Sequence, residues 1–500
     1  MSDLTAAELA DLATIRPDLA QLMTRGIGAV MAYILDLEKR LRATGERLEK
    51  SRRTIIPNSR TSHSPPSQDP RPKPRSRRVK SGKKSGGQPG HVGHRLEPVA
   101  TPDEVVEHAV IECQHCQTDL RREPIAAISR HQIFDLPKIQ LAVTEHRCEQ
   151  KACPECQHVT TAAPPAEASQ PTQYGLRLSG FAVYLTAGHF VPIARTCDII
   201  QTLTGSRPSQ GWVMECQKRV SKNLDGFLDR VTDLLKKAAT ICCDETGFRF
   251  CQKRFWLHVC STAMLTLLMI SRFRGTQAMR EMGILGNIRQ TAIHDHYSSY
   301  FTYDNKHGMC NAHHVRELTY VHEEMGQYWG RRMIRVLIDG KKIKELYHPK
   351  GQQVPEEEIE RITRRYRAAL VAGYSVNPPP PPPLKVKPGK KTRGKVLCLL
   401  DRLKNLEQET LRFLHDPTVP WENNQAERDL RMAKVQQKVS GGFRTEAGAD
   451  IFARCRSYLD TMRKQGHDTM AGIIAALEGK AWMPKSTSRG RHRTKKRQAA

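Results

Sequence analysis

The sequence has no long apolar run. Its least charged stretch, residues 255–271, is interrupted by polar residues such as His258 and Thr266. A transmembrane helix needs about 20 consecutive apolar residues, so we interpret this stretch as paired strands and expect no membrane partner. Residues 1–5 also lack a basic segment leading into an apolar core, so we expect no signal peptide and a cytoplasmic location.

Acidic residues are scarce relative to basic ones. There are 52 Asp and Glu residues against 80 Lys and Arg, a formal net charge of +28. Such a chain favours a polyanionic partner, nucleic acid before a membrane surface. The excess is clustered, with eight Lys or Arg in residues 71–84 and a second basic run in 485–497. The alternative is a solvated tail, but we expect these runs to bind DNA phosphates, with contacts from Arg77, Arg78, Lys83 and Lys84.

Fourteen cysteines in a chain without a secretion signal favour metal ligands and buried thiols over disulfides. Two Cys-x-x-Cys pairs, Cys113/Cys116 and Cys153/Cys156, are separated by 36 residues. Two such knuckles complete a tetrahedral four-cysteine site for one structural zinc, and a chance pairing of free thiols is the alternative. Cys148, His115 and His158 lie nearby and are possible substitute ligands. We expect the apolar residues of 133–143 to supply the strands of a zinc ribbon.

Two segments are predicted to be helical, and each allows two interpretations. Residues 6–52 carry leucines at near-heptad spacing, including Leu37, Leu41 and Leu48. This pattern predicts either a short dimerising coiled coil or one amphipathic helix packed on its own chain.

A second pattern predicts helices at 195–203 and 209–220 around a Gly-Ser-Arg-Pro turn at 205–208. One interpretation is a helix-turn-helix that presents Gln210, Trp212, Lys218 and Arg219 to DNA. The other is a packing hairpin.

Three acidic residues occupy related settings. Apolar runs end at Asp244 and again at Asp295, which predicts two strands that bring both carboxylates to one sheet edge. A helix is predicted after Pro420, with asparagines at 423–424 able to cap it. Its inward stripe is Ala426, Leu430 and Ala433. Glu427 lies on another face, in a row with Asn424, Arg431, Lys434 and Lys438.

Other residues compete for the same role. Glu245 neighbours Asp244 but should face the opposite side of the strand. Further acidic residues, each a surface charge or a substitute ligand, are Asp304, Glu317, Glu422 and Glu446. A group of histidines and a cysteine permits a second zinc site, although we favour core packing or a contact to the cleaved strand for its members, His307, Cys310, His313 and His314.

Several motifs resemble the transposases of the insertion sequence 66 family. They are Asp-Glu-Thr at 244–246, His-Asp-His-Tyr at 294–297, Cys-Asn-Ala-His-His-x-Arg-Glu-Leu at 310–318, Glu-Asn-Asn-Gln-Ala-Glu-Arg-x-Leu-Arg at 422–431, and Lys-Val-Ser-Gly-Gly-Phe-Arg at 438–444 with Gly-Ala at 448–449. The paired cysteine knuckles, the leucine-rich helix and the Ser/Pro-rich linker near 58–66 extend the resemblance over nearly the whole chain.

The resemblance implies a multidomain α/β protein with an RNase H-like catalytic core. It implies a bacterial, nucleoid-associated DDE transposase whose triad is Asp244, Asp295 and Glu427. These carboxylates would hold two Mg²⁺ or Mn²⁺ ions. Water would first free a 3′-hydroxyl at the element's end, and that hydroxyl would then attack target DNA. Alternatives are an RNase H-like nuclease that only cuts, and a zinc-dependent DNA-binding regulator.

The implied partners are the element's terminal inverted repeats, target DNA, a second copy of the chain and accessory proteins of the same element. We expect the DNA backbone to contact Arg428, Arg431, Lys434, Lys438 and Arg444. The expected division is a leucine-zipper-like oligomerisation segment at 1–56, a basic linker at 57–100, a zinc-binding domain at 101–165, a helical region at 166–238, a catalytic domain at 239–475 and a basic tail at 476–500.

The catalytic domain contains an insertion at 320–416. Helices are predicted there at 356–369 and 395–413, and a six-proline segment at 378–383 predicts polyproline II. We interpret the insertion as a subdomain that holds DNA or a partner chain, with a simple spacer as the alternative. A final helix is predicted after Gly448, with an inward stripe that includes Cys455, Tyr458 and Met462, and an end near Gly466.

Overall fold

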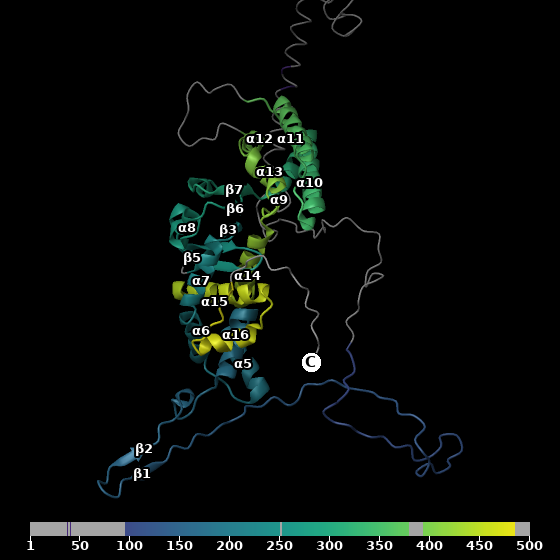
Figure 1. Cartoon of the computed structure of the whole chain (residues 1–500), viewed down its shortest axis with the longest axis vertical. Coiled ribbons are helices and arrows are strands. Elements are labelled where there is room, and N and C mark those ends of the chain that lie inside the picture. Colours follow the sequence, from purple (N-terminus) through teal and green to yellow (C-terminus); the bar gives the residue numbers. More distant parts are fainter. Residues whose placement is uncertain (1–37, 39–40, 42–95, 251–252, 380–393, 486–500) are drawn as a thin grey trace, which may run out of the picture. The chain divides into compact units, whose positions relative to one another are not determined.

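The computed structural model describes Glu38, Leu41 and residues 96–250, 253–379 and 394–485 (Figure 1). Most of the predicted N-terminal helix and of the six-proline segment lies outside these residues, as do the basic run at 71–84, with Arg77, Arg78, Lys83 and Lys84, and the end of the basic tail. The chain is mixed α/β and divides into two compact units. Of the described ranges, one unit comprises 313–337, 365–379 and 394–401, and the other comprises 96–250, 253–312, 338–364 and 402–485.

The larger unit is built on a five-stranded sheet with the order β5-β4-β3-β6-β7. The strands are β3 (Thr240–Phe250), β4 (Lys253–Ser261), β5 (Thr266–Ser271), β6 (Thr291–His294) and β7 (Lys306–Met309). Strands β3, β4 and β5 form an antiparallel meander, while β6 runs parallel to β3 and β7 parallel to β6. The paired strands predicted for residues 255–271 are therefore confirmed as β4 and β5.

Strand β3 does not end at Asp244, and that prediction was wrong. The strand continues to Phe250 because β4 supplies an antiparallel partner from Cys242 to Phe250. On its other edge β3 pairs with β6 only over Thr240–Cys242. Asp244 thus lies in mid-strand, just beyond the point where the parallel partner stops.

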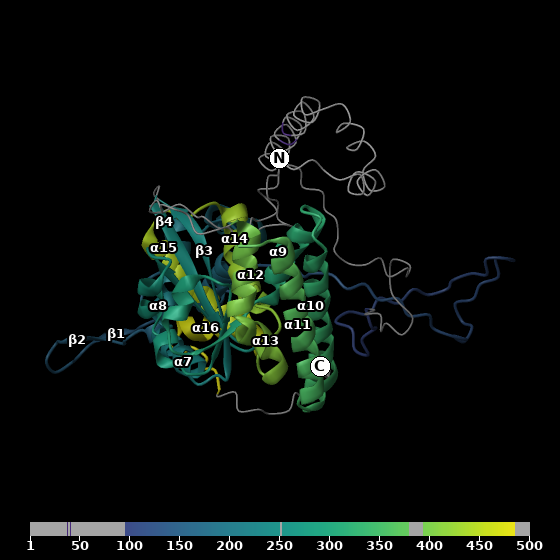
Figure 2. The same ribbon diagram turned by 90° about the horizontal axis from the view of Figure 1, so that it is seen from above.

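Nine α-helices of the described part lie wholly in the larger unit (Figures 1 and 2). They are α4 (Leu176–Val183), α5 (Ile193–Thr204), α6 (Gln210–Lys222), α7 (Asp225–Lys236), α8 (Thr276–Met282), α13 (Glu407–His415), α14 (Asn424–Ser440), α15 (Glu446–Lys464) and α16 (Thr469–Leu477). A π-helical turn at Tyr184–Gly188 continues α4. The helix predicted after Gly448 is confirmed as α15, but it is not the final helix, because α16 follows the left-handed Gly466, φ 73°.

The hairpin of α5 and α6 agrees with the predicted helices. Gly205 ends α5 in the left-handed conformation, and the Ser209 side chain caps α6 by accepting from the Trp212 N–H at 3.1 Å. Helix α6 packs against α4, α5, α15 and α16. The Trp212 ring meets Tyr174 edge-on and packs against the core instead of facing outward. These contacts favour the packing hairpin.

The two faces of β3 have different neighbours. Cys243 lies 3.3 Å from Cys260 across the strand pair and packs in the core cluster with Met279 and Met282 of α8. The side chain of Cys242 is influenced by the charges of Lys464 and Asp429, from α15 and α14. Because side chains alternate along a strand, Asp244 shares the face of Cys242, toward α14.

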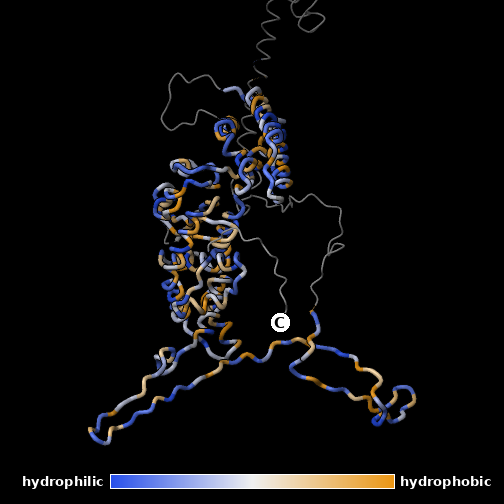
Figure 3. Tube along the Cα trace, viewed as in Figure 1, coloured by the Kyte–Doolittle hydropathy of each residue, from blue (hydrophilic) through white to orange (hydrophobic). Residues whose placement is uncertain are grey.

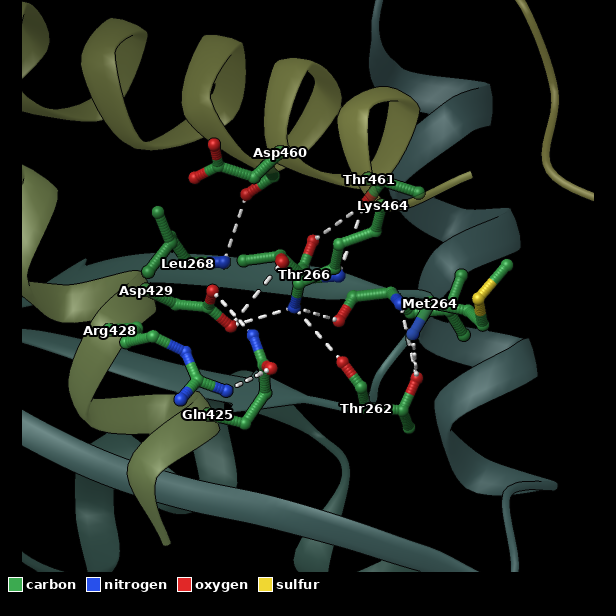
Figure 4. A network of polar contacts seen from close by, with 12 residues as sticks. Thr262, Met264, Thr266, Leu268, Gln425, Arg428, Asp429, Asp460, Thr461 and Lys464 are labelled. Atoms are coloured by element: carbon green, nitrogen blue, oxygen red, sulfur yellow. Dashed lines mark hydrogen bonds and ion pairs between the residues drawn. The ribbon is translucent and has the colours of Figure 1, made fainter. Parts of the chain in front are cut away.

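Helix α14 is held to the sheet by apolar and charged contacts. Its predicted inward stripe is confirmed, since Ala426, Leu430 and Ala433 are all buried. Asp429 is buried too and receives the Lys464 ammonium at 2.8 Å (Figure 4). The same ammonium donates to the carbonyls of Thr262 and Leu265, and Gln425 donates to Asp429. One lysine of α15 therefore ties α14 to the β4–β5 turn.

The remaining helices of the described part each run from one unit into the other. They are α9 (Asn311–Glu323), α10 (Tyr328–Tyr347), α11 (Glu356–Val376) and α12 (Lys395–Asn405). The predicted helix at 356–369 is confirmed as α11. The predicted helix at 395–413 is two helices, α12 and α13, that break at Leu406. Helices α9 and α10 were not predicted.

Within the smaller unit, hydrogen bonds between side chains join segments that are distant in the sequence. The side-chain amides of Gln327 and Asn377 exchange hydrogen bonds at 2.9 Å. Trp329 Nε1 donates to Gln327 at 2.6 Å, and its buried ring packs beside Gly373.

No helix of the described part is both long enough and apolar enough to cross a membrane.

Replacing Lys464 with methionine should destabilise the fold strongly, because it leaves the buried Asp429 carboxylate without its cation. We expect a loss of about 3–5 kcal/mol in the free energy of unfolding, measured by urea denaturation with tryptophan fluorescence. The exposed pair of Lys480 and Glu478, 4.0 Å apart, is the matched control. A substitution Lys480→Met should change stability by less than about 1 kcal/mol. Equal effects of the two substitutions would contradict the role given to Lys464.

Candidate active site

Asp244 and Asp295 lie level with each other on adjacent parallel strands. The β3–β6 register pairs Thr240 with Thr291 and Cys242 with Ile293, and the same offset pairs Asp244 with Asp295, one residue past β6. Each carboxylate accepts one backbone hydrogen bond at 2.8 Å, Asp244 from Glu245 and Asp295 from Tyr297. The second oxygen of each accepts no hydrogen bond from the described residues.

The start of α14 brings Glu427 close enough to Asp244 for its charge to act on that carboxyl group. Glu427 lies in the first turn, where the helix N-terminus favours a negative charge. The preceding Asn423 does not cap the helix with its side chain, so that prediction was wrong. Its Nδ2 instead donates at 2.7 Å to the carbonyl of Cys243, the neighbour of Asp244, and its backbone N–H donates to the Cys310 sulfur. Asn423 thus joins α14 directly to β3.

The carboxylates influence one another electrostatically. The pKa of Asp244 is raised well above its usual range, first by burial and then by the charges of Glu245, Asp295 and Glu427. Neither Asp244 nor Asp295 forms an ion pair within the described part of the chain. Asp244 and Asp295, two acidic groups near each other without an ion pair to the described residues, favour a bound cation.

The three carboxylates are close without forming one tight cluster. Among the described residues, the ligand oxygens of Asp244, Asp295 and Glu427 do not all lie within 4.8 Å of one another. Their proximity is expressed in the charges of Asp295 and Glu427, which both act on Asp244.

Glu245 has a different role from its neighbour. Its side chain is only 1% exposed, and it accepts from Arg274 Nε at 2.9 Å and from the Tyr300 hydroxyl at 2.6 Å. Burial and the charge of Asp295 raise its pKa, against these two partners. Since both oxygens are engaged, Glu245 is not available as a metal ligand. Arg274 and Tyr300 were missed by the sequence analysis because neither lies in a recognisable spacing.

The predicted basic row divides into two groups. Arg428, Arg431, Lys438 and Arg444 are exposed, so they are accessible to a DNA backbone. Lys434 is half-buried, donates to the Gly247 carbonyl and lies 4.9 Å from the Phe248 ring centroid. Burial lowers its pKa. The ammonium of Lys434 therefore holds α14 to β3, and a DNA contact is expected mainly from the other four.

Members of the histidine and cysteine group have structural contacts. His307 Nδ1 lies 3.0 Å from His294 Nε2, and His307 Nε2 lies 3.3 Å from the Tyr303 carbonyl. The buried Cys310 accepts from the Asn423 N–H, and its sulfur also lies within 4.8 Å of a Glu427 carboxylate oxygen. These contacts agree with core packing for His307 and Cys310.

The two cysteine knuckles have the same local geometry. In the first knuckle the Cys113 N–H donates to the Thr118 carbonyl, and the Gln117 N–H donates to the Cys113 carbonyl. In the second, the Cys153 N–H donates to the His158 carbonyl, and the Gln157 N–H donates to the Cys153 carbonyl. All four bonds are 2.9 Å long. Gln117 and Gln157 both have φ 61°. Each knuckle is therefore a complete turn before any second knuckle joins it.

Hydrogen bonds within each knuckle favour the thiolate, which is the form that binds zinc. They lower the pKa of Cys116, mainly through the Thr118 side chain. They lower the pKa of Cys153 as well, mainly through the backbone N–H of Cys156. Cys116 and Cys156 are exposed, while Cys113 and Cys153 are partly exposed, so all four sulfurs can be reached from solvent.

The structure does not assemble the predicted four-cysteine site. Among the described residues, no three of the sulfurs of Cys113, Cys116, Cys153 and Cys156 come within 4.8 Å of one another. The described residues therefore hold two separate pairs, and a single tetrahedral zinc centre formed by Cys113, Cys116, Cys153 and Cys156 stays a prediction. Strands β1 (Gln150–Ala152) and β2 (Val159–Thr161) flank the second knuckle, and no sheet of the described residues links it to the first.

The segment between the knuckles lacks the predicted strands. The prediction of strands within 133–143 was wrong, because these residues are extended without a pairing partner. Figure 3 shows apolar positions along this segment, and Ile133 and Val143 are 94% and 90% exposed. Such residues need a partner surface, which closure of the two knuckles on one zinc would create.

Two models of known protein families match the chain, one over the central sheet and its helices and one over the cysteine knuckles. Residues 171–451 match a family model described as transposase IS66 family. Residues 111–157 match a model described as the zinc-finger binding domain of transposase IS66. No curated protein matches the chain.

The sheet with its helices and the paired cysteine knuckles therefore define a transposase with a zinc-finger domain, a class of protein that acts on DNA. The first match covers more than half of the chain. The chain belongs to the IS66 family of transposases, as its motifs predicted.

Replacing Asp244 with asparagine should stabilise the metal-free protein. The raised pKa means that the charged form opposes folding, so this cost is absent below pH ~4, the unfolded value, and grows as the pH rises from there through the folded pKa. We expect Asp244→Asn to raise the melting temperature by ~2–4 °C near neutral pH and less at pH 4. It should also abolish stabilisation by added Mn²⁺. Asp229, an exposed carboxylate of α7, is the matched control, and an equal gain in Asp229→Asn would contradict the argument.

Zinc should protect the knuckle thiols and order residues 105–145. In zinc-free protein, iodoacetamide should label Cys116 and Cys153 first, since their lowered pKa values favour the thiolate. The buried Cys242 and Cys455, whose pKa values burial raises to about 12, should stay unlabelled at pH 8.

Added zinc should block labelling of both knuckles, Cys156 included, and slow amide hydrogen exchange near Ile133. The variant Cys156→Ser removes one ligand and should lose most of this protection at the other three cysteines. Labelling of all four knuckle cysteines at an unchanged rate with zinc would exclude the site.

Proposed function

We propose that the protein is a DDE transposase with an RNase H-like core. It cleaves DNA at the ends of its element and joins the freed 3′-hydroxyl to target DNA. The observation that carries this proposal is the convergence of Asp244, Asp295 and Glu427, whose mutual repulsion contributes to the raised pKa of Asp244. The sheet order β5-β4-β3-β6-β7, with an antiparallel meander followed by two parallel strands, supports the RNase H-like assignment.

The donor set fits magnesium or manganese. All three residues offer carboxylate oxygens, which hard divalent cations prefer to sulfur. Two such ions, when bound, polarise the phosphate and stabilise the attacking and departing oxygens of an in-line displacement. The chain's own residues fix the geometry. Asp295 is oriented by the Tyr297 N–H, and Glu427 is positioned through the anchor from Asn423 to β3.

The reaction takes place in two displacements at phosphorus. In the first, the oxygen of water bonds to phosphorus and the bond to the 3′-oxygen breaks, which leaves a 3′-hydroxyl and a 5′-phosphate. In the second, that 3′-hydroxyl attacks a target phosphate and displaces the 3′-oxygen of the target strand. Each step breaks one ester bond and forms one P–O bond, so no covalent enzyme intermediate and no external energy source are required.

The rest of the chain supplies DNA binding. The exposed residues Arg428, Arg431 and Lys438 lie on the helix that carries Glu427, so a strand bound along this row reaches the carboxylates. The zinc-finger domain, with Cys113, Cys116, Cys153 and Cys156 as the proposed ligands of one structural zinc, and the basic runs add further contacts. We propose that two copies act on paired element ends. The leucine-rich segment expected to join them lies outside the described residues, and accessory proteins of the element stay an expectation.

Substitution of each carboxylate should abolish cleavage and strand transfer but not DNA binding. The substrate is duplex DNA carrying the ends of the element that encodes the chain, with about 5 mM Mg²⁺ to fill a two-metal site. We expect Asp244→Asn, Asp295→Asn and Glu427→Gln each to lower the cleavage rate by at least about 10³-fold. Filter binding or gel shift in Ca²⁺ should show affinities within about threefold of the native protein.

The matched controls are Asp304→Asn and Glu422→Gln, which remove acidic residues close to the second and third carboxylates in the chain. Both variants should cleave at nearly the native rate. Cleavage without any joined product would favour a nuclease. DNA binding without cleavage by the native protein would favour a regulator and overturn the proposal.

A further inference from the structure

Arg274 is held rigidly beside the candidate carboxylates. Its guanidinium carbon lies 4.9 Å from the ring centroid of Trp256 and 4.2 Å from that of Tyr297. Its Nε donates to Glu245 at 2.9 Å. The second oxygen of Glu245 is occupied by Tyr300. Two aromatic rings and a buried carboxylate thus fix the plane and direction of this guanidinium, a cation–π arrangement that costs little further ordering on binding a ligand.

The remaining donors of Arg274 are available. Its Nη1 and Nη2 groups make no hydrogen bond to any residue within the described ranges, and its side chain is 41% exposed. Arginine carries planar donors that match two oxygens of one phosphate. A guanidinium needed only to neutralise Glu245 would be expected to use its paired donors on that carboxylate as well. Here a single Nε bond is made, and the other donors remain accessible.

The location connects Arg274 to the reaction. Tyr297, which stacks on the guanidinium, donates its backbone N–H to Asp295. Burial opposes the charge of Arg274, but the charges of Glu245 and Asp295 together raise the arginine pKa. The ion pair with Glu245 offsets part of the charge of Arg274, which reduces its repulsion from divalent cations. It keeps its directional N–H donors.

We infer that Arg274 binds a non-bridging phosphate oxygen of the DNA strand at the cleavage position or the next phosphate, with Trp256, Tyr297 and Glu245 as its positioning residues. This inference rests on the proposed cleavage at Asp244, Asp295 and Glu427. A phosphate held there is fixed relative to Asp295 before reaction. The N–H groups of Arg274 then stabilise the negative charge that develops on the phosphate oxygens during the displacement.

The neighbouring Arg272 provides a matched control. It lies two residues earlier in the same connection and is exposed. It also lies over an aromatic ring, 5.7 Å from the Phe255 centroid, and is paired with Glu446 at 2.8 Å. Its pKa is raised by that pairing. Arg272 therefore shares the charge, the segment and the aromatic contact of Arg274, but it has no link to Asp295.

The test is ethylation interference on element-end DNA in Ca²⁺, so that binding is read without cleavage. For the native protein, ethylating the contacted phosphate should exclude the DNA from the complex. For Arg274→Gln that single position should lose its interference, while all others keep theirs. The affinity for unmodified DNA should fall about tenfold or more. Arg272→Gln should keep the complete native pattern.

Folding is controlled by two further variants. Arg274→Gln leaves Glu245 buried and unpaired, so the double variant Glu245→Gln/Arg274→Gln is compared with it, and Arg274→Lys keeps the charge without the paired donors. Loss of the same interference position in the double variant supports the inference. If Arg274→Gln and the double variant both give the native interference pattern, the inference is overturned, even if the native protein cleaves. If the native protein binds but does not cleave, the proposed function fails, and the interference result still reports separately on Arg274.

Discussion

The structure depends on a carboxylate that the fold leaves without a cation. Asp244 lies within a strand of the central sheet, its pKa is raised by burial and by other carboxylates, and no lysine or arginine of the described chain pairs with it. Such an arrangement opposes folding of the metal-free protein. The fold tolerates this cost only if the surrounding elements hold the strand and helix in place by other means. Those means are polar anchors that fix α14 against the sheet.

The anchors act at three levels along α14. Asn423 donates to the carbonyl of Cys243, directly before Asp244. Asp429, two residues after Glu427, receives Lys464, which also holds the β4–β5 turn. Lys434 donates to Gly247 further along β3. Side-chain to backbone bonds of this kind fix the position of a helix along a strand, which apolar packing alone does not determine. A site that must hold ions to within about 0.5 Å needs this second set of contacts.

The strands before Asp244 and Asp295 and the helix that carries Glu427 could be predicted from the sequence, because the apolar runs and the apolar stripe are local patterns. The errors arise where a partner decides the outcome. Strand β3 passes Asp244 because β4 pairs with it, and Asn423 does not cap its helix because the Cys243 carbonyl competes for its amide. The spacing of the cysteines fixes each knuckle, but the meeting of Cys156 with the first knuckle depends on residues 133–143, which have strand composition and no pairing edge.

The contrast between Asp244 and Glu245 explains how adjacent acids take separate roles. Alternation along β3 turns them to opposite faces, one toward α14 and one toward Tyr300 and Arg274. Both oxygens of Glu245 accept hydrogen bonds, from Arg274 and Tyr300, so this side chain orients a guanidinium. Asp244 keeps an oxygen without a hydrogen bond from the described chain and so remains open to a cation. Exchanging these two residues would keep composition and charge, yet the longer side chain at 244 and the shorter one at 245 would displace both carboxylates from these positions.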